Sequence, residues 1–294
     1  MHSFANSDRD PFSDAFWMHF FESGAPPVAM LDIGTGNGAI PMVASRVLGA
    51  RVRIVGIDTA VVKPDSVKCP ELERVQFLSE TSCESLPFAD ESFDMVTSQF
   101  AIEYTDMDAS LDEVLRVRRP SARVAFVMHA DDSHIGNVSK AQIEQIDWLL
   151  GPGGFHDAAQ RMIKVLEARN DAKSTGVLDP ELVRHQYNAS ARALVQKIEQ
   201  AGMGDALARS AVVVQRLLAA AAKGQRNDGT ALLGDASAAF RGEAQRLRAQ
   251  LIASLSLPQV AEIAGRLRYA GLQVKVGELH YQGSLMAHTL VATP

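Results

Sequence analysis

The chain has few cysteines, little net charge and no long hydrophobic run. Its 294 residues include two cysteines, Cys69 and Cys83, which are too few for a disulfide framework and predict reduced thiols in a cytoplasmic protein. No apolar stretch reaches the roughly 20 residues of a membrane-spanning helix. Residues 1–11 contain acids and no apolar segment, which argues against a secretion signal. The net charge of −6 argues against nonspecific nucleic-acid binding.

The first part of the chain alternates short apolar runs with helical patterns. The alternation predicts a parallel sheet with right-handed crossovers, because nearly continuous apolar runs are typical of strands buried on both faces. The strand-like runs are residues 28–33, 52–57, 75–78, 93–97 and 123–128, with helical patterns at 13–22, 37–48 and 106–118. Pro64 and Pro70 argue against a full helix over residues 59–73.

Helical patterns without a convincing strand continue from residue 133 to residue 256, with helices predicted at 139–150, 155–170, 180–202, 205–223 and 237–254. A helix at 258–270 and two strand-like runs, 272–279 and 285–292, follow. We therefore predict a sheet domain made of residues 1–132 and 257–294, with residues 133–256 inserted as a helical cap. The cap is a lid or a dimerisation arm, and apolar faces exposed on it would favour a homodimer.

A glycine-rich turn, Leu-Asp-Ile-Gly-Thr-Gly-Asn-Gly, spans residues 31–38 between a predicted strand and a predicted helix. Glycine has no Cβ and accepts positive φ, so a ligand can approach the backbone closely. Asp32, taken as an ionised carboxylate, would repel phosphate and attract a cation. S-adenosylmethionine carries a sulfonium and an ammonium and no phosphate. Asp58 ends the second strand-like run, where an acid reaches the ribose hydroxyls of an adenosine ligand.

The run Glu84-Ser-Leu-Pro-Phe-Ala-Asp-Glu-Ser-Phe-Asp94 precedes the fourth predicted strand. With the glycine turn and Asp58 in this order, the sequence resembles the class I S-adenosylmethionine-dependent methyltransferases, in the small-molecule branch with this Leu-Pro-Phe to Ser-Phe-Asp run. The resemblance covers residues 28–130 and, more weakly, 258–292. It implies a Rossmann-like α/β fold with a seven-stranded, mostly parallel sheet flanked by helices, the last strand antiparallel.

The same resemblance implies transfer of a methyl group from S-adenosyl-L-methionine to a small-molecule acceptor, leaving S-adenosyl-L-homocysteine. Ser82 stands where many relatives have an aspartate that accepts the adenine amino group. The matching positions imply a cofactor site made of Asp32, Gly34, Thr35, Gly36, Gly38, Asp58, Thr59, Ser82, Cys83, Glu84, Gln99 and Phe100.

Candidate catalytic residues follow the fourth and fifth strand-like runs, at the edge where open α/β sheets bind ligands. His129 would act as a general base toward a hydroxyl or amine, and Glu103 and Tyr104 would contact the substrate. His129, Asp131, Asp132 and His134 match no fixed metal-ligand spacing, so no metal site is predicted.

Two other functions remain open from the sequence alone. Gly34-x-Gly36-x-x-Ala39 with Asp58 is compatible with an NAD(P)-dependent oxidoreductase, although Asp32 and the Leu-Pro-Phe run argue against it. A noncatalytic cofactor-binding scaffold is the other alternative. The sequence does not decide whether the acceptor atom is oxygen, nitrogen or carbon, because catalysis by positioning leaves no residue signature.

Overall fold

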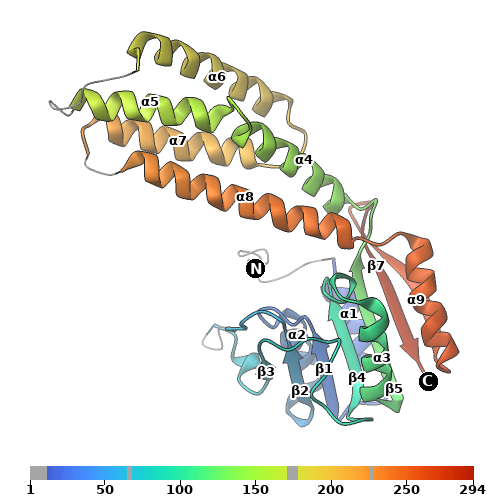
Figure 1. The fold of residues 1–294 in the computed structure, drawn as a ribbon. Coiled ribbons are helices and arrows are strands. Elements are labelled where there is room, and N and C mark those ends of the chain that lie inside the picture. Colours follow the sequence, from blue (N-terminus) through green and yellow to red (C-terminus); the bar gives the residue numbers. More distant parts are fainter. Residues whose placement is uncertain (1–11, 65–67, 171–177, 226–227) are drawn as a thin grey trace. The chain divides into compact units, whose positions relative to one another are not determined.

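The computed structural model describes residues 12–64, 68–170, 178–225 and 228–294. The chain forms two compact units (Figure 1). The sheet unit comprises Met1–Gly136 and Ile252–Pro294, and the helical unit comprises Asn137–Leu251.

The sheet unit contains a seven-stranded sheet with the order β3-β2-β1-β4-β5-β7-β6. Neighbouring strands are parallel except at β7, which is antiparallel to both β5 and β6. The predicted mostly parallel sheet with an antiparallel last strand is confirmed. The strands are β1 (Ala29–Ile33), β2 (Arg53–Ile57), β3 (Gln76–Leu78), β4 (Phe93–Gln99), β5 (Arg118–His129), β6 (Gln273–Tyr281) and β7 (Ser284–Thr293).

Helices cover both faces of this sheet (Figure 1). One core joins the strands to α3 (Met107–Val117) and α9 (Leu257–Tyr269), and the other joins them to α1 (Asp14–Glu22) and α2 (Ala39–Leu48). Three short 3-10 helices, η1 (Gly49–Arg51), η2 (Pro70–Leu72) and η3 (Ile102–Tyr104), occupy connections. In the described part of residues 59–73 only η2 is helical, as the two prolines predict.

Among the described residues, five helices lie between β5 and α9 along the chain, and the core of the helical unit is built from their apolar faces. They are α4 (His134–Leu150), α5 (Phe155–Asn170), α6 (Pro180–Gln200), α7 (Ala206–Ala222) and α8 (Gly229–Ala253). The sequence pattern predicts the start of α8 at residue 237, but the helix begins at Gly229 because the carboxylate of Asp228 accepts the N–H of Ala231 and caps it. Among the described helices, none combines the length and apolar character needed to cross a membrane.

Arg116, Arg118 and Arg119 form a basic stripe at the end of α3, and Arg116 has a structural role there. Arg116 bonds the carboxylates of Glu113 and Asp90 and the carbonyls of Leu86 and Phe88. These bonds hold the loop before β4 against α3, which favours the structural interpretation of this stripe over a nucleic-acid patch.

Candidate functional site

The carboxyl ends of β1, β2, β4 and β5 meet at one edge of the sheet because these four strands are parallel. Asp32 in β1 lies in register with Gly56 on one side and Thr97 on the other. The glycine turn, Asp58, Phe100 and His129 all lie at or just beyond these strand ends. Open α/β sheets bind their ligands at this edge.

The turn after β1 depends on its glycines. Gly34, Gly36 and Gly38 have φ of +66°, +52° and +85°, which L side chains rarely adopt. A Cβ on Gly34 would lie 2.0 Å from the Cβ of Ala101, whereas a Cβ on Gly36 would meet no atom within 4 Å among the described residues. The N–H of Thr35 donates to the carbonyl of Ile57 at 2.9 Å and anchors the turn to β2. The turn therefore fits a ligand that packs on the backbone at Gly36.

Asp32 is buried beneath this turn, with 1% of its surface exposed. Burial raises the pKa of Asp32 to about 7, although the Thr97 hydroxyl, which donates to Oδ1 at 2.7 Å, acts in the opposite direction. The expectation of a fully ionised carboxylate is thus wrong at neutral pH. A nearby cation would favour the ionised form, so Asp32 is suited to bind a positively charged group and to lose its proton as it does so.

Asp58 follows β2 and connects it to the glycine turn. Its Oδ2 accepts the N–H of Gly36 at 2.9 Å, and its Oδ1 accepts the N–H of Ala60 at 2.8 Å. A carboxylate offers about four acceptor positions. Two therefore remain, one on each oxygen, and they match the two hydroxyls of a ribose. Thr59, the next residue, is exposed.

The three residues expected beside adenine are engaged with their own surroundings. The N–H of Glu84 donates to Oγ of Ser82, and Oε1 of Glu84 accepts the N–H of Asp106 at 2.9 Å. Cys83 is buried, with Sγ 3.1 Å from Oγ of Ser110. Cys83 can therefore contact an adenine base through its backbone and not through its side chain. Ser82 has no carboxylate with which to accept the adenine amino group.

Gln99 and Phe100 lie at the end of β4, and aromatic groups surround them. The indole N–H of Trp17 in α1 donates to Oε1 of Gln99 at 2.5 Å. Phe100 has φ of +53°, in a region that few side chains adopt, and its ring centroid lies 4.2 Å from that of His129. The α1 aromatics Trp17, Phe20 and Phe21 belong to the core.

The structure brings His129 and Glu103 together. Glu103 is buried in η3, and its Oε1 accepts both the backbone N–H of His129 at 2.9 Å and the ring Nδ1–H at 2.8 Å. Because Nδ1 holds the proton, Nε2 carries the free lone pair, as a general base requires. Glu103 therefore orients this histidine, whereas Asp131 and Asp132 are exposed.

Tyr104 approaches the same histidine edge to face, with ring centroids 5.8 Å apart. Burial raises the pKa of the Tyr104 phenol, which keeps it protonated at neutral pH. It can donate a hydrogen bond to a substrate but cannot serve as a base.

Sequence reasoning missed Thr97, whose hydroxyl holds the Asp32 carboxylate. The available signal was a polar pair, Thr97 and Ser98, inside an otherwise apolar strand; both residues are fully buried. Buried hydroxyls of this kind almost always have a partner.

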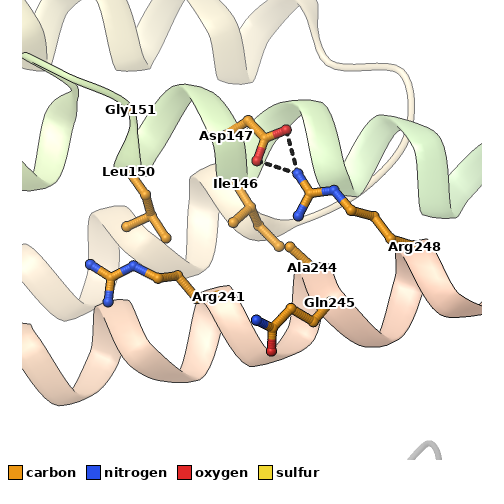
Figure 2. A pocket seen from close by; sticks show the side chains of 8 residues that line it. All are labelled: Ile146, Asp147, Leu150, Gly151, Arg241, Ala244, Gln245 and Arg248. Atoms are coloured by element: carbon orange, nitrogen blue, oxygen red, sulfur yellow. Dashed lines mark hydrogen bonds and ion pairs between the residues drawn. The ribbon is translucent and has the colours of Figure 1, made fainter.

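The helical unit has a cavity of its own, about 440 Å³ in volume, between α4 and α8 (Figure 2). On one side of it, Nη2 of Arg248 donates to both carboxylate oxygens of Asp147, at 2.6 and 2.7 Å. Arg241 lies on the α8 side of the cavity. The remaining lining residues are Ile146, Leu150, Gly151, Ala244 and Gln245.

The segment that contributes most of this edge of the sheet is similar in sequence to methyltransferases. Residues 31–126 match the sequence model of a family described as "Methyltransferase domain". Over 104 residues the chain is 32% identical to the ubiquinone/menaquinone biosynthesis C-methyltransferase UbiE of Geobacter sulfurreducens, covering 33% of this chain and 40% of that protein. It is also 26% identical over 114 residues to the uncharacterized protein Rv1405c of Mycobacterium tuberculosis, covering 38% of this chain and 41% of that protein.

The chain thus spans about two fifths of the length of these curated relatives. Among solved structures, a SAM-dependent methyltransferase from Aquifex aeolicus aligns over 96% of this chain and 93% of its own, with 14% identity and a TM-score of 0.45. The YcgJ protein of Bacillus subtilis aligns over 43% of this chain and 58% of its own, with 27% identity and a TM-score of 0.36. The part of the chain that carries the glycine turn, residues 31–126, is thus similar to a methyltransferase domain.

Proposed function

We propose that the protein is an S-adenosylmethionine-dependent methyltransferase of the small-molecule branch. The observation that carries the proposal is the pair of carboxylates at one edge of the sheet. Asp58 is tied to the glycine turn with one acceptor position free on each oxygen, and Asp32 is buried beneath that turn. This arrangement fits an adenosine ligand that carries a positive charge and no phosphate.

In this proposal each part of the turn binds one part of the cofactor. Asp58 accepts both ribose hydroxyls, the Gly36 backbone lies against the ligand, and ionised Asp32 attracts the ammonium group. When bound, the cofactor supplies a methyl group on a positively charged sulfur. The chain's contribution is largely positioning, which places the acceptor in line with that methyl group.

His129 accepts the acceptor's proton when the acceptor has to lose one. Its Nε2 takes the proton as the acceptor atom forms its new bond to the methyl group, and Glu103 at Nδ1 stabilises the resulting imidazolium. Phe100 packs against the imidazole at a centroid distance of 4.2 Å and limits the ring positions open to it. Glu103 is therefore a positioning residue and His129 the proton acceptor.

Calorimetric titration with S-adenosylmethionine tests the proposal. We expect Asp58→Asn to weaken binding by roughly 10- to 150-fold, because charge-assisted hydrogen bonds contribute about 1.5–3 kcal/mol. Glu262→Gln, an exposed carboxylate on α9, is the matched control and should bind like the wild type. If the wild type bound NAD but not S-adenosylmethionine, the oxidoreductase alternative would replace this proposal.

The acceptor in this proposal is a small molecule, in agreement with the net charge of −6. The homodimer prediction rests on the helical unit, whose exposed large hydrophobic side chains include Leu182, Val195 and Val212. Light scattering coupled to size-exclusion chromatography should give twice the chain mass of 31.7 kDa. A single-chain mass at micromolar concentration would contradict it.

A further inference from the structure

Three side chains with metal-binding chemistry converge where β5 ends and β7 passes beside it. Asp131 and Asp132 lie in the turn after β5, and His288 lies in β7. One ligand atom from each, two carboxylate oxygens and one imidazole nitrogen, lie within 4.8 Å of one another. A single ion could contact all three after small side-chain rotations.

His288 is the residue that makes this cluster more than a pair of surface acids. Only 2% of its surface is exposed, yet neither Nδ1 nor Nε2 has a hydrogen-bond partner among the described residues. Buried polar groups are nearly always satisfied, so a buried imidazole with both nitrogens unpaired requires a partner of another kind. A cation held jointly with two carboxylates is such a partner.

The cluster is separate from the His129 and Glu103 pair. In the β5–β7 ladder, His288 stands opposite Met128, and His129 stands opposite Ala287. Successive side chains of a strand point to opposite faces. His288 and His129 therefore face opposite sides of the sheet.

The backbone around the two aspartates is held in place. The N–H of Asp131 donates to the carbonyl of Leu255, and the N–H of Leu255 donates to the carbonyl of His129. The turn is thus fixed on both sides before any ion binds, which lowers the entropy cost of assembling the ligands.

We propose that Asp131, Asp132 and His288 bind a divalent first-row transition-metal ion, with Zn²⁺ or Mn²⁺ preferred over Mg²⁺ and Ca²⁺. The imidazole ligand favours the former group, since Mg²⁺ and Ca²⁺ select oxygen ligands. Two carboxylates balance the charge of the ion, and three protein ligands leave further positions for water. The bound ion links the end of β5 to β7.

This proposal departs from the prediction of no metal site made from the sequence. The closely spaced candidate ligands of residues 129–134 do not include His288, which lies in β7. Only the antiparallel pairing of β7 with β5 brings His288 to the two aspartates.

Titration of the chelator-treated full chain with Zn²⁺, and separately with Mn²⁺, tests the site without any cofactor. We expect one saturable site per chain in the wild type. The double variant Asp131→Asn, Asp132→Asn should weaken it by more than about tenfold, because removing even an outer-shell partner costs roughly 10- to 100-fold. Both aspartates are exposed, so the variant should fold.

Asp235→Asn, an exposed aspartate on α8, is the matched control and should leave the site unchanged. Adventitious ions at other surface groups would bind equally to both variants. The ring ¹⁵N resonances of His288, assigned with His288→Gln, should shift when Zn²⁺ is added to the wild type. Failure of Zn²⁺ and Mn²⁺ to saturate a site below about 1 mM, or equal affinities for the wild type and the double aspartate variant, would overturn the proposal.

Discussion

Lowering the pH from 7.5 to 5.5 should weaken the binding of S-adenosylmethionine through protonation of Asp32. Burial holds the pKa of Asp32 near 7 in the free protein. A cationic ligand favours the ionised form, so the pKa falls on binding and a proton is released. The affinity for S-adenosylmethionine should therefore rise as the pH increases through the pKa of Asp32 in the free protein, and fall at lower pH.

The size of the effect follows from the ionised fraction. With a pKa of about 7, roughly three quarters of the Asp32 side chains are ionised at pH 7.5 and about 3% at pH 5.5. Because the apparent dissociation constant scales inversely with the competent fraction, the affinity should fall about 20-fold over this range. Near pH 7, about half a proton should be released for each ligand bound.

Calorimetry in two buffers with different ionisation enthalpies measures both quantities. Asp32→Asn, which cannot ionise, should bind weakly and with little pH dependence. Thr97→Val removes the hydroxyl that donates to Asp32 and should move the midpoint upward by about one to two pH units, since a hydrogen bond to a charged group contributes about 1.5–3 kcal/mol.

A wild-type affinity that stays constant between pH 7.5 and 5.5 would refute this reasoning. An equal slope in Asp32→Asn would do the same, because the proton would then come from another group. S-adenosylhomocysteine, which keeps the ammonium and lacks the sulfonium, shows which charge Asp32 senses. A pH dependence with this ligand that equals that of S-adenosylmethionine assigns the contact to the ammonium.

Three further predictions concern the turn, the helical unit and the proton acceptor. Gly34→Ala should lower the free energy of unfolding by about 1–3 kcal/mol in a urea titration, because its Cβ would clash with that of Ala101. Adding Ala101→Gly should remove this clash and leave a loss of about 1 kcal/mol, which comes from the positive φ of residue 34. Burial lowers the pKa of His156 to about 4, so the stability that its neutral form provides is complete above pH 6.5. The free energy of unfolding should decline by up to about 3 kcal/mol as the pH falls to 4. Unfolding followed by circular dichroism at several pH values checks this, and His156→Gln should show a flatter pH profile than the wild type. With an acceptor found by screening, Glu103→Gln should lower kcat by roughly 100-fold and leave KM unchanged, because it misorients His129; a change confined to KM would argue for a binding role instead.

Much of the sheet unit could be predicted because its signals are local. The apolar runs of β1, β2, β4, β5 and β7 report the burial of their own strands, and Pro64 and Pro70 together argue against a long helix between β2 and β3. Gly34 and Gly36 were recognisable because a turn with positive φ at those positions accepts few other residues. The start of α8 was missed because an apolar pattern shows where a helix packs, while its first residue depends on the cap at Asp228.

By itself, then, the sequence determined which strands and helices follow one another along the chain, the glycine turn after β1 and the acid Asp58 after β2. Each of these depends on neighbours along the chain. The tertiary structure alone decided which distant side chains meet. The register of β4 and β5 brings Glu103 to His129, and the pairing of β7 with β5 brings His288 to the two aspartates. Packing around β1 likewise decided the protonation of Asp32, because a pKa responds to the solvent and charges around a group, and folding places both there from remote parts of the sequence.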